Sequence, residues 1–115
     1  MEITKIPNKI LAKKMAGVAI TDIKKGSYRE LISGMKKAMK ENEGVGLAAN
    51  QIGRDLAIFV IDAKTANTFL VSEVYFNPEI TEYSHETDAM EEGCLSIPGF
   101  YIPVTRAKKI KIKAV

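Results

Sequence analysis

The sequence predicts an α+β fold in which one N-terminal helix packs on an antiparallel β-sheet. Three observations predict it. An amphipathic pattern of helical period occupies residues 28–42, the second half of the chain is rich in short apolar or alternating runs, and proline or glycine separates those runs. With 115 residues, 46% of them apolar and 27% charged, the chain has the size and composition of one globular domain, which we expect to span residues 1–115.

The helix is predicted from its apolar stripe and from signals at both ends. The residues that recur at the spacing of one helical face are Leu31, Ile32, Met35 and Met39. Ser27 followed three residues later by Glu30 predicts a capping box at the start, and Gly44 predicts the end. Residues 1–26, with Pro7 and Gly26 as breakers, predict only short irregular pieces.

The strands are predicted from short runs with β-type patterning. In chain order the candidates are residues 56–61, 69–76, 79–84, 102–104 and 108–115. The first is continuously apolar, which predicts a strand buried on both faces. Asn77-Pro78 closes the second, and Pro98-Gly99 predicts a turn. In the last, alternation predicts isoleucines that face inward and lysines that face water.

Composition excludes several classes of protein. No apolar run approaches the roughly 20 residues that span a bilayer, and residues 1–7 have no apolar stretch of the kind found in signal peptides. A single cysteine excludes an internal disulfide, which fits a reducing cytoplasm. The net charge of +3 is mild. The lysines at residues 108–113 suit a nucleic-acid patch or, more simply, the solvated face of a strand. We therefore expect a cytoplasmic protein without membrane or specific nucleic-acid binding.

A glycine-rich run at residues 44–51 (Gly-Val-Gly-Leu-Ala-Ala-Asn-Gln) is the first candidate for a functional site. Its glycines allow close approach of a ligand, and the Gln51 amide offers a donor for a developing oxyanion. The run leads from a helix to a strand, whereas phosphate-binding loops lead from a strand to a helix, which argues against a nucleotide site. A tight connection with a surface glutamine remains the alternative.

Cys94 is the second candidate. Glu91 and Glu92 would disfavour its thiolate unless a cation compensates, and a metal ion would do so. A small buried hydrophobe or a nucleophile paired with His85, the single histidine, are the alternatives. His85-Glu86 resembles the start of a zinc motif, but Ala89 stands where the second histidine belongs, so we expect a solvated histidine.

Together the two runs resemble the motifs of the peptide deformylase family. Residues 44–51 match its pattern Gly-apolar-Gly-apolar-Ala-Ala-x-Gln, and residues 92–96 match Glu-Gly-Cys-Leu-Ser. Asn77-Pro78-Glu79 and Val104-x-Arg106 are similar to the family too. The resemblance extends from about residue 3 to the last residue. A chance match to both motifs in this order is very improbable.

The resemblance implies a divalent metal, Fe²⁺ or Zn²⁺, held by Cys94 and by two histidines of a third motif, His-Glu-x-x-His, whose glutamate is the general base. It also implies that Gln51 and the backbone N–H of Leu95 form the oxyanion hole. Val45, Gly46 and Glu92 would contact the substrate. Tyr101 stands where some members carry a basic residue, which leaves substrate anchoring there open.

The implied activity is hydrolysis of the formyl group from the N-terminal formyl-methionine of nascent polypeptides, with the ribosome as candidate partner. None of the 21 residues after Cys94 is a histidine, so the third motif and the C-terminal helix that bears it are missing. The last predicted strand also runs to Ala114-Val115 without a turn. We therefore expect an incomplete fragment that neither holds the metal nor is active alone. A degenerate, non-catalytic module that binds a peptide or a partner is the alternative.

Overall fold

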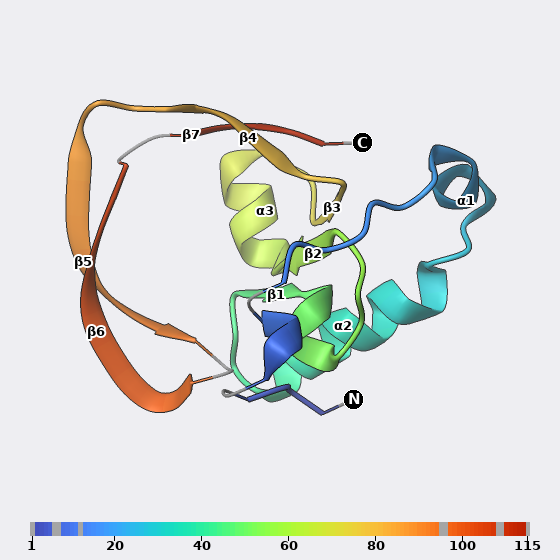
Figure 1. Cartoon of the computed structure of the whole chain (residues 1–115), viewed down its shortest axis with the longest axis horizontal. Coiled ribbons are helices and arrows are strands. Elements are labelled where there is room, and N and C mark those ends of the chain that lie inside the picture. The colour runs from blue at the N-terminus through green and yellow to red at the C-terminus, as the bar shows by residue number, and fades with distance from the viewer. Residues whose placement is uncertain (1, 6–7, 12, 95–96, 108–109, 115) are drawn as a thin grey trace.

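The computed structural model describes residues 2–5, 8–11, 13–94, 97–107 and 110–114 (Figure 1). Its helices are the 3-10 helix η1 (Lys9–Leu11), α1 (Ile20–Lys25), α2 (Arg29–Glu41), the 3-10 helix η2 (Ala49–Ile52) and α3 (Ala63–Phe69). Its strands are β1 (Gly46–Ala48), β2 (Ile58–Ile61), β3 (Val74–Phe76), β4 (Glu79–Tyr83), β5 (Thr87–Cys94), β6 (Ile97–Ala107) and β7 (Ile110–Lys113). The predicted α+β class is confirmed. Within the described part of the chain, no helix is both long and apolar enough to cross a membrane.

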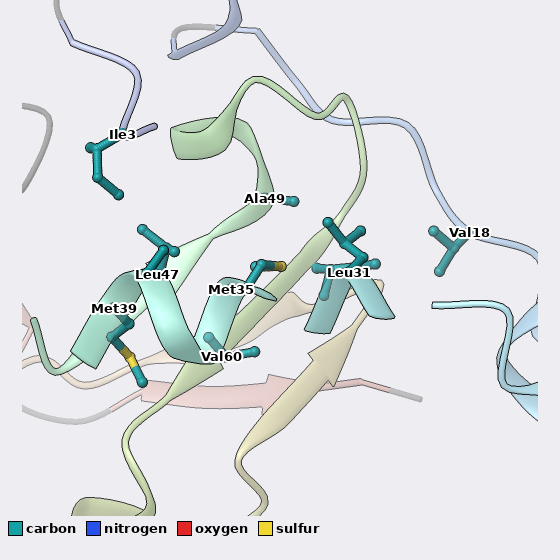
Figure 2. Packing of buried hydrophobic residues seen from close by; sticks show 10 residues of the cluster. Ile3, Val18, Leu31, Met35, Met39, Leu47, Ala49 and Val60 are labelled. Carbon is teal, nitrogen blue, oxygen red and sulfur yellow. The ribbon is translucent and has the colours of Figure 1, made fainter. Parts of the chain in front are cut away.

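The described strands form three antiparallel sheets, in the orders β1-β2-β3, β4-β7 and β5-β6. Helix α2, predicted at residues 28–42, packs its apolar stripe on the first sheet, as predicted. Met35 of the helix and Val60 of β2 are completely buried there (Figure 2). Leu47 of β1 joins the same cluster. Burial of one such side chain contributes about 1.5–3 kcal/mol, so this layer carries most of the core.

The predicted capping box at the start of α2 is wrong. The N-cap residue is Tyr28, which makes no side-chain cap hydrogen bond. Ser27 instead donates its N–H to the carbonyl of Asp22 (3.1 Å), as part of the end of α1. Gly26 takes the left-handed conformation there (φ 73°). The glycine taken for a breaker is therefore the C-terminal cap of a helix that the sequence patterns missed.

Strand β2 is shorter than the predicted run at residues 56–61, and its burial alternates. Ile58 and Val60 are buried, whereas Phe59 is only partly so. The ring of Phe59 stacks on Tyr75 of β3, with centroids 4.5 Å apart. The prediction of burial on both faces therefore fails, because α2 covers only one face and a cross-strand aromatic pair occupies the other.

Helix α3 precedes the predicted strand at residues 69–76 and includes the first residue of that range, Phe69. The carboxylate of Asp62 accepts hydrogen bonds from both the backbone N–H and the hydroxyl of Thr65 (2.8 Å each), which caps the helix. The helix ends at Phe69 and is followed by Leu70, the left-handed C-terminal cap residue (φ 53°). Only residues 74–76 remain as strand β3, so the predicted strand at 69–76 is correct only in its last part.

The strands β4 to β7 form two antiparallel two-stranded ribbons, β4 with β7 and β5 with β6. Figure 1 shows β5 and β6 as a long curved pair that stands apart from the helices along most of its length. Pro98-Gly99 lies inside β6 rather than in the predicted turn. Between the pairs Glu92↔Ile102 and Cys94↔Ile97, four residues of β6 lie opposite one of β5. This irregularity accommodates the proline and the glycine within the strand.

Strands β4 and β7 pair with one apolar face and one charged face. Ile80 lies opposite Ile112, and Tyr83 lies opposite Ile110. All four side chains are between 43% and 63% exposed, so the inward-facing isoleucines predicted for the last strand are wrong for the described residues. Their strands form a separate two-stranded sheet, which the α2 layer does not bury.

Candidate active site

The glycine-rich run folds into strand β1 followed by the 3-10 turn η2, which carries Gln51. The side-chain oxygen of Gln51 accepts a hydrogen bond from the backbone N–H of Ala48 (3.0 Å). Since a backbone N–H pairs only with an acceptor, this contact assigns the two ends of the amide. The oxygen points back to the turn, and the NH₂ group is the end that serves as a donor.

The turn is tied to the N-terminal segment. The backbone N–H of Thr4 donates to the carbonyl of Gln51, and the Asn50 amide donates to the carbonyl of Ile10 (3.3 Å). Ala49, the first residue of the turn, is completely buried. The position of Gln51 is therefore set by contacts on both its side chain and its backbone.

Val45 and Gly46, predicted to contact the substrate, lie just before this turn. Val45 is 72% exposed, and its carbonyl accepts from the N–H of Asp62 (3.0 Å). Gly46 is the first residue of β1 and pairs with Ile61. An accessible apolar side chain on an anchored backbone suits contact with an apolar ligand group.

A cavity of about 580 Å³ opens beside the same run. Its walls come from β2, from the N-terminal segment and from the residues after β3; they include Met15, Ala48, Asn50, Ile58 and Asn77. Asn77 is left-handed (φ 50°), which asparagine tolerates better than most residues. Its amide accepts from the N–H of Val18 (2.7 Å) and donates to the carbonyl of Val18 (2.9 Å).

Asp55 holds the same N-terminal wall. Its carboxylate accepts from the Lys13 ammonium (2.6 Å) and from the N–H of Ala16 (3.1 Å). These two hydrogen bonds, that from Lys13 first, lower the pKa of the Asp55 carboxyl. The carbonyl of Ala16 accepts in turn from the N–H of Ala57 (2.8 Å). The N-terminal wall of the cavity is thus hydrogen-bonded to Asp55 and Ala57, which precede β2, and to Asn77, which follows β3.

The second motif lies on the β5–β6 ribbon. Cys94 is the last residue of β5 and pairs with Ile97, and Glu92 pairs with Ile102. The side chains of Glu92 and Cys94, and the whole of Leu95, fall outside what the structure describes. Their predicted roles therefore stay predictions.

His85 is exposed in the bend between β4 and β5, as predicted. The strand that separates it from Cys94 is extended from Thr87 onward. At roughly 3.3 Å per residue, the seven steps from Thr87 to Cys94 cover about 23 Å of strand. This arrangement argues against a nucleophile–base pair of Cys94 and His85.

Comparison with known proteins decides the family. A family model described as polypeptide deformylase matches residues 1–115. The chain belongs to the polypeptide deformylase family. Among its relatives, peptide deformylase 1 of Clostridium perfringens is 47% identical over 108 residues, which make up 93% of this chain and 68% of the relative. A peptide deformylase of Prochlorococcus marinus is 38% identical over 97% of this chain and 54% of its own length.

Solved structures of the family share this fold. A peptide deformylase from Legionella pneumophila has a TM-score of 0.84 at 38% identity, over 99% of this chain and 64% of its own. A class I type b peptide deformylase from Acinetobacter baumannii has a TM-score of 0.88 at 31% identity, over 100% and 75%. The chain thus spans between about half and three quarters of the length of these relatives.

The deformylase family implies a divalent metal, but the donors of this chain do not make up a complete site. Among the described residues, no three histidine, cysteine, aspartate or glutamate side chains gather where they would hold a metal ion. The full sequence contains one histidine, His85, and one cysteine, Cys94. A donor set of one thiolate and two imidazoles is therefore beyond what these 115 residues supply.

Two structural roles near the site escaped the sequence patterns. Asn77 was noted as the end of a strand, but its hydrogen bonds to Val18 beside the cavity were not predicted, although asparagine directly after a strand-like run favours a left-handed turn. Thr4, which holds Gln51, carried no signal. It acts through its backbone N–H, which every residue except proline has, so only the tertiary arrangement reveals the contact.

Proposed function

We propose that residues 44–51 and 92–96 form the substrate-polarising part of a peptide deformylase site, which hydrolyses the formyl group from the N-terminal formyl-methionine of nascent polypeptides. The observation that carries the proposal is the hydrogen bond from Ala48 to the Gln51 side chain, which leaves the amide NH₂ as the donating end. The relatives described above are peptide deformylases, which supports the same reaction.

In this proposal Gln51 and the backbone N–H of Leu95 donate to the formyl oxygen as negative charge develops on it. Such a donor typically contributes about 10²–10³ in rate when it is fixed before the reaction begins. The contacts of η2 to Ala48 and Thr4 provide that fixation. Val45 and Gly46 contact the methionyl part of the substrate, together with Glu92.

We further propose that the 115-residue chain is inactive by itself. Cys94 is the single proposed metal ligand, with iron or zinc as the metal, and the sequence contains no His-Glu-x-x-His motif that would supply the two further ligands and the general base. Residues 1–115 are thus one unit that binds and polarises the substrate. The ribosome is the proposed partner, because it presents the nascent chain, and the cytoplasm the proposed compartment.

The test is formate release from a formyl-Met peptide, measured for two proteins. One is this chain. The other is a chimera that joins it to the unmatched remainder of the Clostridium perfringens relative, which matches this chain at 47% identity. We expect no metal-dependent formate release from the chain and clear release from the chimera.

Formate release by the chain alone would contradict its proposed inactivity. A folded, metal-loaded chimera that binds the peptide without releasing formate would instead support the non-catalytic binding module.

A further inference from the structure

We propose that Thr4 is a positioning residue for the Gln51 amide through its backbone N–H, with the carbonyl of Ile10 as a second contact. The inference rests on the proposed role of Gln51 as a donor to the substrate. It adds a group outside both motifs, and its test is independent of any turnover.

The need for such an element follows from the turn itself. η2 is a four-residue 3-10 helix, Ala49–Ile52, and helices of this kind have poor hydrogen-bond geometry and little stability of their own. Gln51 is near its end, so the hydrogen bond to Ala48 holds only as long as the turn keeps its shape. External contacts must therefore supply the rigidity that an oxyanion donor requires.

The first external contact is made by Thr4. Its N–H donates to the carbonyl of Gln51, the residue that bears the amide. The neighbouring Ile3 is only 9% exposed and belongs to the same apolar cluster as Leu47 and Ala49 (Figure 2). The donor is thus anchored in the core on one side of the turn. It is not a loose N-terminal group.

Thr4 also lies over the end of the turn. Gly53 follows η2 in the left-handed conformation (φ 79°), and a Cβ placed on it would lie 3.8 Å from the Thr4 hydroxyl oxygen. A second contact comes from η1, where the carbonyl of Ile10 accepts from the Asn50 amide (3.3 Å). Residues 50 and 51 are therefore both held by the N-terminal segment.

The experiment compares Thr4→Pro, which removes the donor, with Thr4→Ala, which keeps it. NMR of the 115-residue chain reports amide exchange at Gly53 and Arg54, whose N–H groups bond the carbonyls of Asn50 and Ala49 within the turn. It also reports the side-chain NH₂ signals of Gln51. Ile61, whose N–H bonds to Glu73 in the sheet, is the reference for the core.

For Thr4→Pro we expect exchange about 2- to 12-fold faster at the turn amides, as the loss of one hydrogen bond predicts. The Gln51 NH₂ signals should move toward those of a free glutamine, and Ile61 should not change. Thr4→Ala should match the unsubstituted chain. An unchanged turn in Thr4→Pro would overturn the proposal. So would equal acceleration at Ile61, because the segment would then be only a general stabiliser.

If Thr4→Pro does not fold, amide hydrogen exchange in the unsubstituted chain tests the proposal instead. The N–H of Thr4 should then exchange at least about tenfold more slowly than a free amide. Free exchange at Thr4 would overturn the inference. It would leave the deformylase proposal intact, since that depends on formate release by the chimera.

Discussion

The sheet under α2 and the β4–β7 ribbon contain the same types of apolar residue but bury them to very different degrees. In the first, Ile58 and Val60 are 2% and 0% exposed, whereas in the ribbon Ile80 and Ile112 are each 43% exposed. Both pairs lie on antiparallel strands, although the β4–β7 register shifts after Ile80. The difference is the second layer, because α2 covers one sheet and no described helix covers the ribbon to the same degree. Strand patterning therefore sets which face is apolar, and the covering element sets whether that face is buried.

The comparison has energetic consequences. A buried aliphatic side chain contributes about 1.5–3 kcal/mol, and one that is nearly half exposed contributes much less. Two-stranded ribbons are at best marginally stable by themselves. We therefore expect the ribbon to open at lower free energy than the α2 layer, and its apolar face to promote association.

The largest effect should come from the α2 layer. Met35→Ala removes a completely buried side chain and leaves a cavity, which should lower the free energy of unfolding by about 2–5 kcal/mol. Ile112→Ala, at a 43% exposed site, is the matched control and should cost under about 1 kcal/mol. Urea denaturation measures both. Equal losses would show that coverage by α2 does not distinguish the two regions.

The next effect concerns the two hydrogen bonds between the Asn77 side chain and the backbone of Val18. Asn77→Ala removes both hydrogen bonds and places a residue with a Cβ in the left-handed conformation, so we expect a loss of about 1–3 kcal/mol. Asn77→Gly removes the bonds but tolerates the conformation, so it should cost less. Thermal unfolding separates the two contributions. A Gly variant as unstable as the Ala variant would mean that the conformation contributes nothing.

A smaller effect is expected on the ribbon. The double substitution Ile80→Thr and Ile112→Thr keeps β-branched side chains but makes the exposed face polar. It should reduce binding of an apolar dye and self-association, and change the free energy of unfolding by about 0.5 kcal/mol or less. Glu82→Gln, which breaks the exposed ion pair with Lys111 on the other face, is the control. Unchanged dye binding in the double variant would locate the apolar surface elsewhere.

The smallest effect is a pH dependence at Asp55. The pKa of its carboxyl is lowered in the folded chain from the ordinary value of 3.8 by Lys13 and Ala16. Because the pKa is lower in the folded chain, the contribution of Asp55 to the free energy of unfolding is fully present above its unfolded pKa. It is lost as the pH falls through the folded pKa. Stability measured between about pH 5 and pH 2 should therefore fall less in Asp55→Asn than in the unsubstituted chain. Identical pH profiles would show that Asp55 does not contribute to the pH dependence of stability.

The parts of this fold that sequence patterns predicted are those with a local periodic signal. The apolar stripe of α2 located the helix within one residue at each end. The glycine-rich run was correctly predicted to connect a helix to a strand, but the 3-10 turn η2 within it was not predicted. Helix α3 was missed because its sequence, Ala-Lys-Thr-Ala-Asn-Thr-Phe, has no apolar stripe. Its start is specified by the cap that Asp62 forms with Thr65, a signal shared by many turns.

Other features depended on contacts that no local pattern encodes. Pro98-Gly99 is a turn signal in most contexts, yet both residues lie within β6, where the register of its pairing with β5 shifts. The exposure of Ile110 and Ile112 depends on which element covers the ribbon. The hydrogen bond from Thr4 to Gln51 joins residues 47 positions apart (51 − 4) through backbone groups common to all sequences. Tertiary placement alone decides such features.

The most direct measurement of the central claim is metal content and formate turnover in the chimera, for two variants. If Cys94 holds the metal and Gln51 polarises the substrate, Cys94→Ala should lose bound metal and turnover together. Gln51→Ala should keep the metal and lose about 10²–10³ in turnover. Stoichiometric metal in Cys94→Ala, or full turnover in Gln51→Ala, would contradict the division of roles between the two motifs.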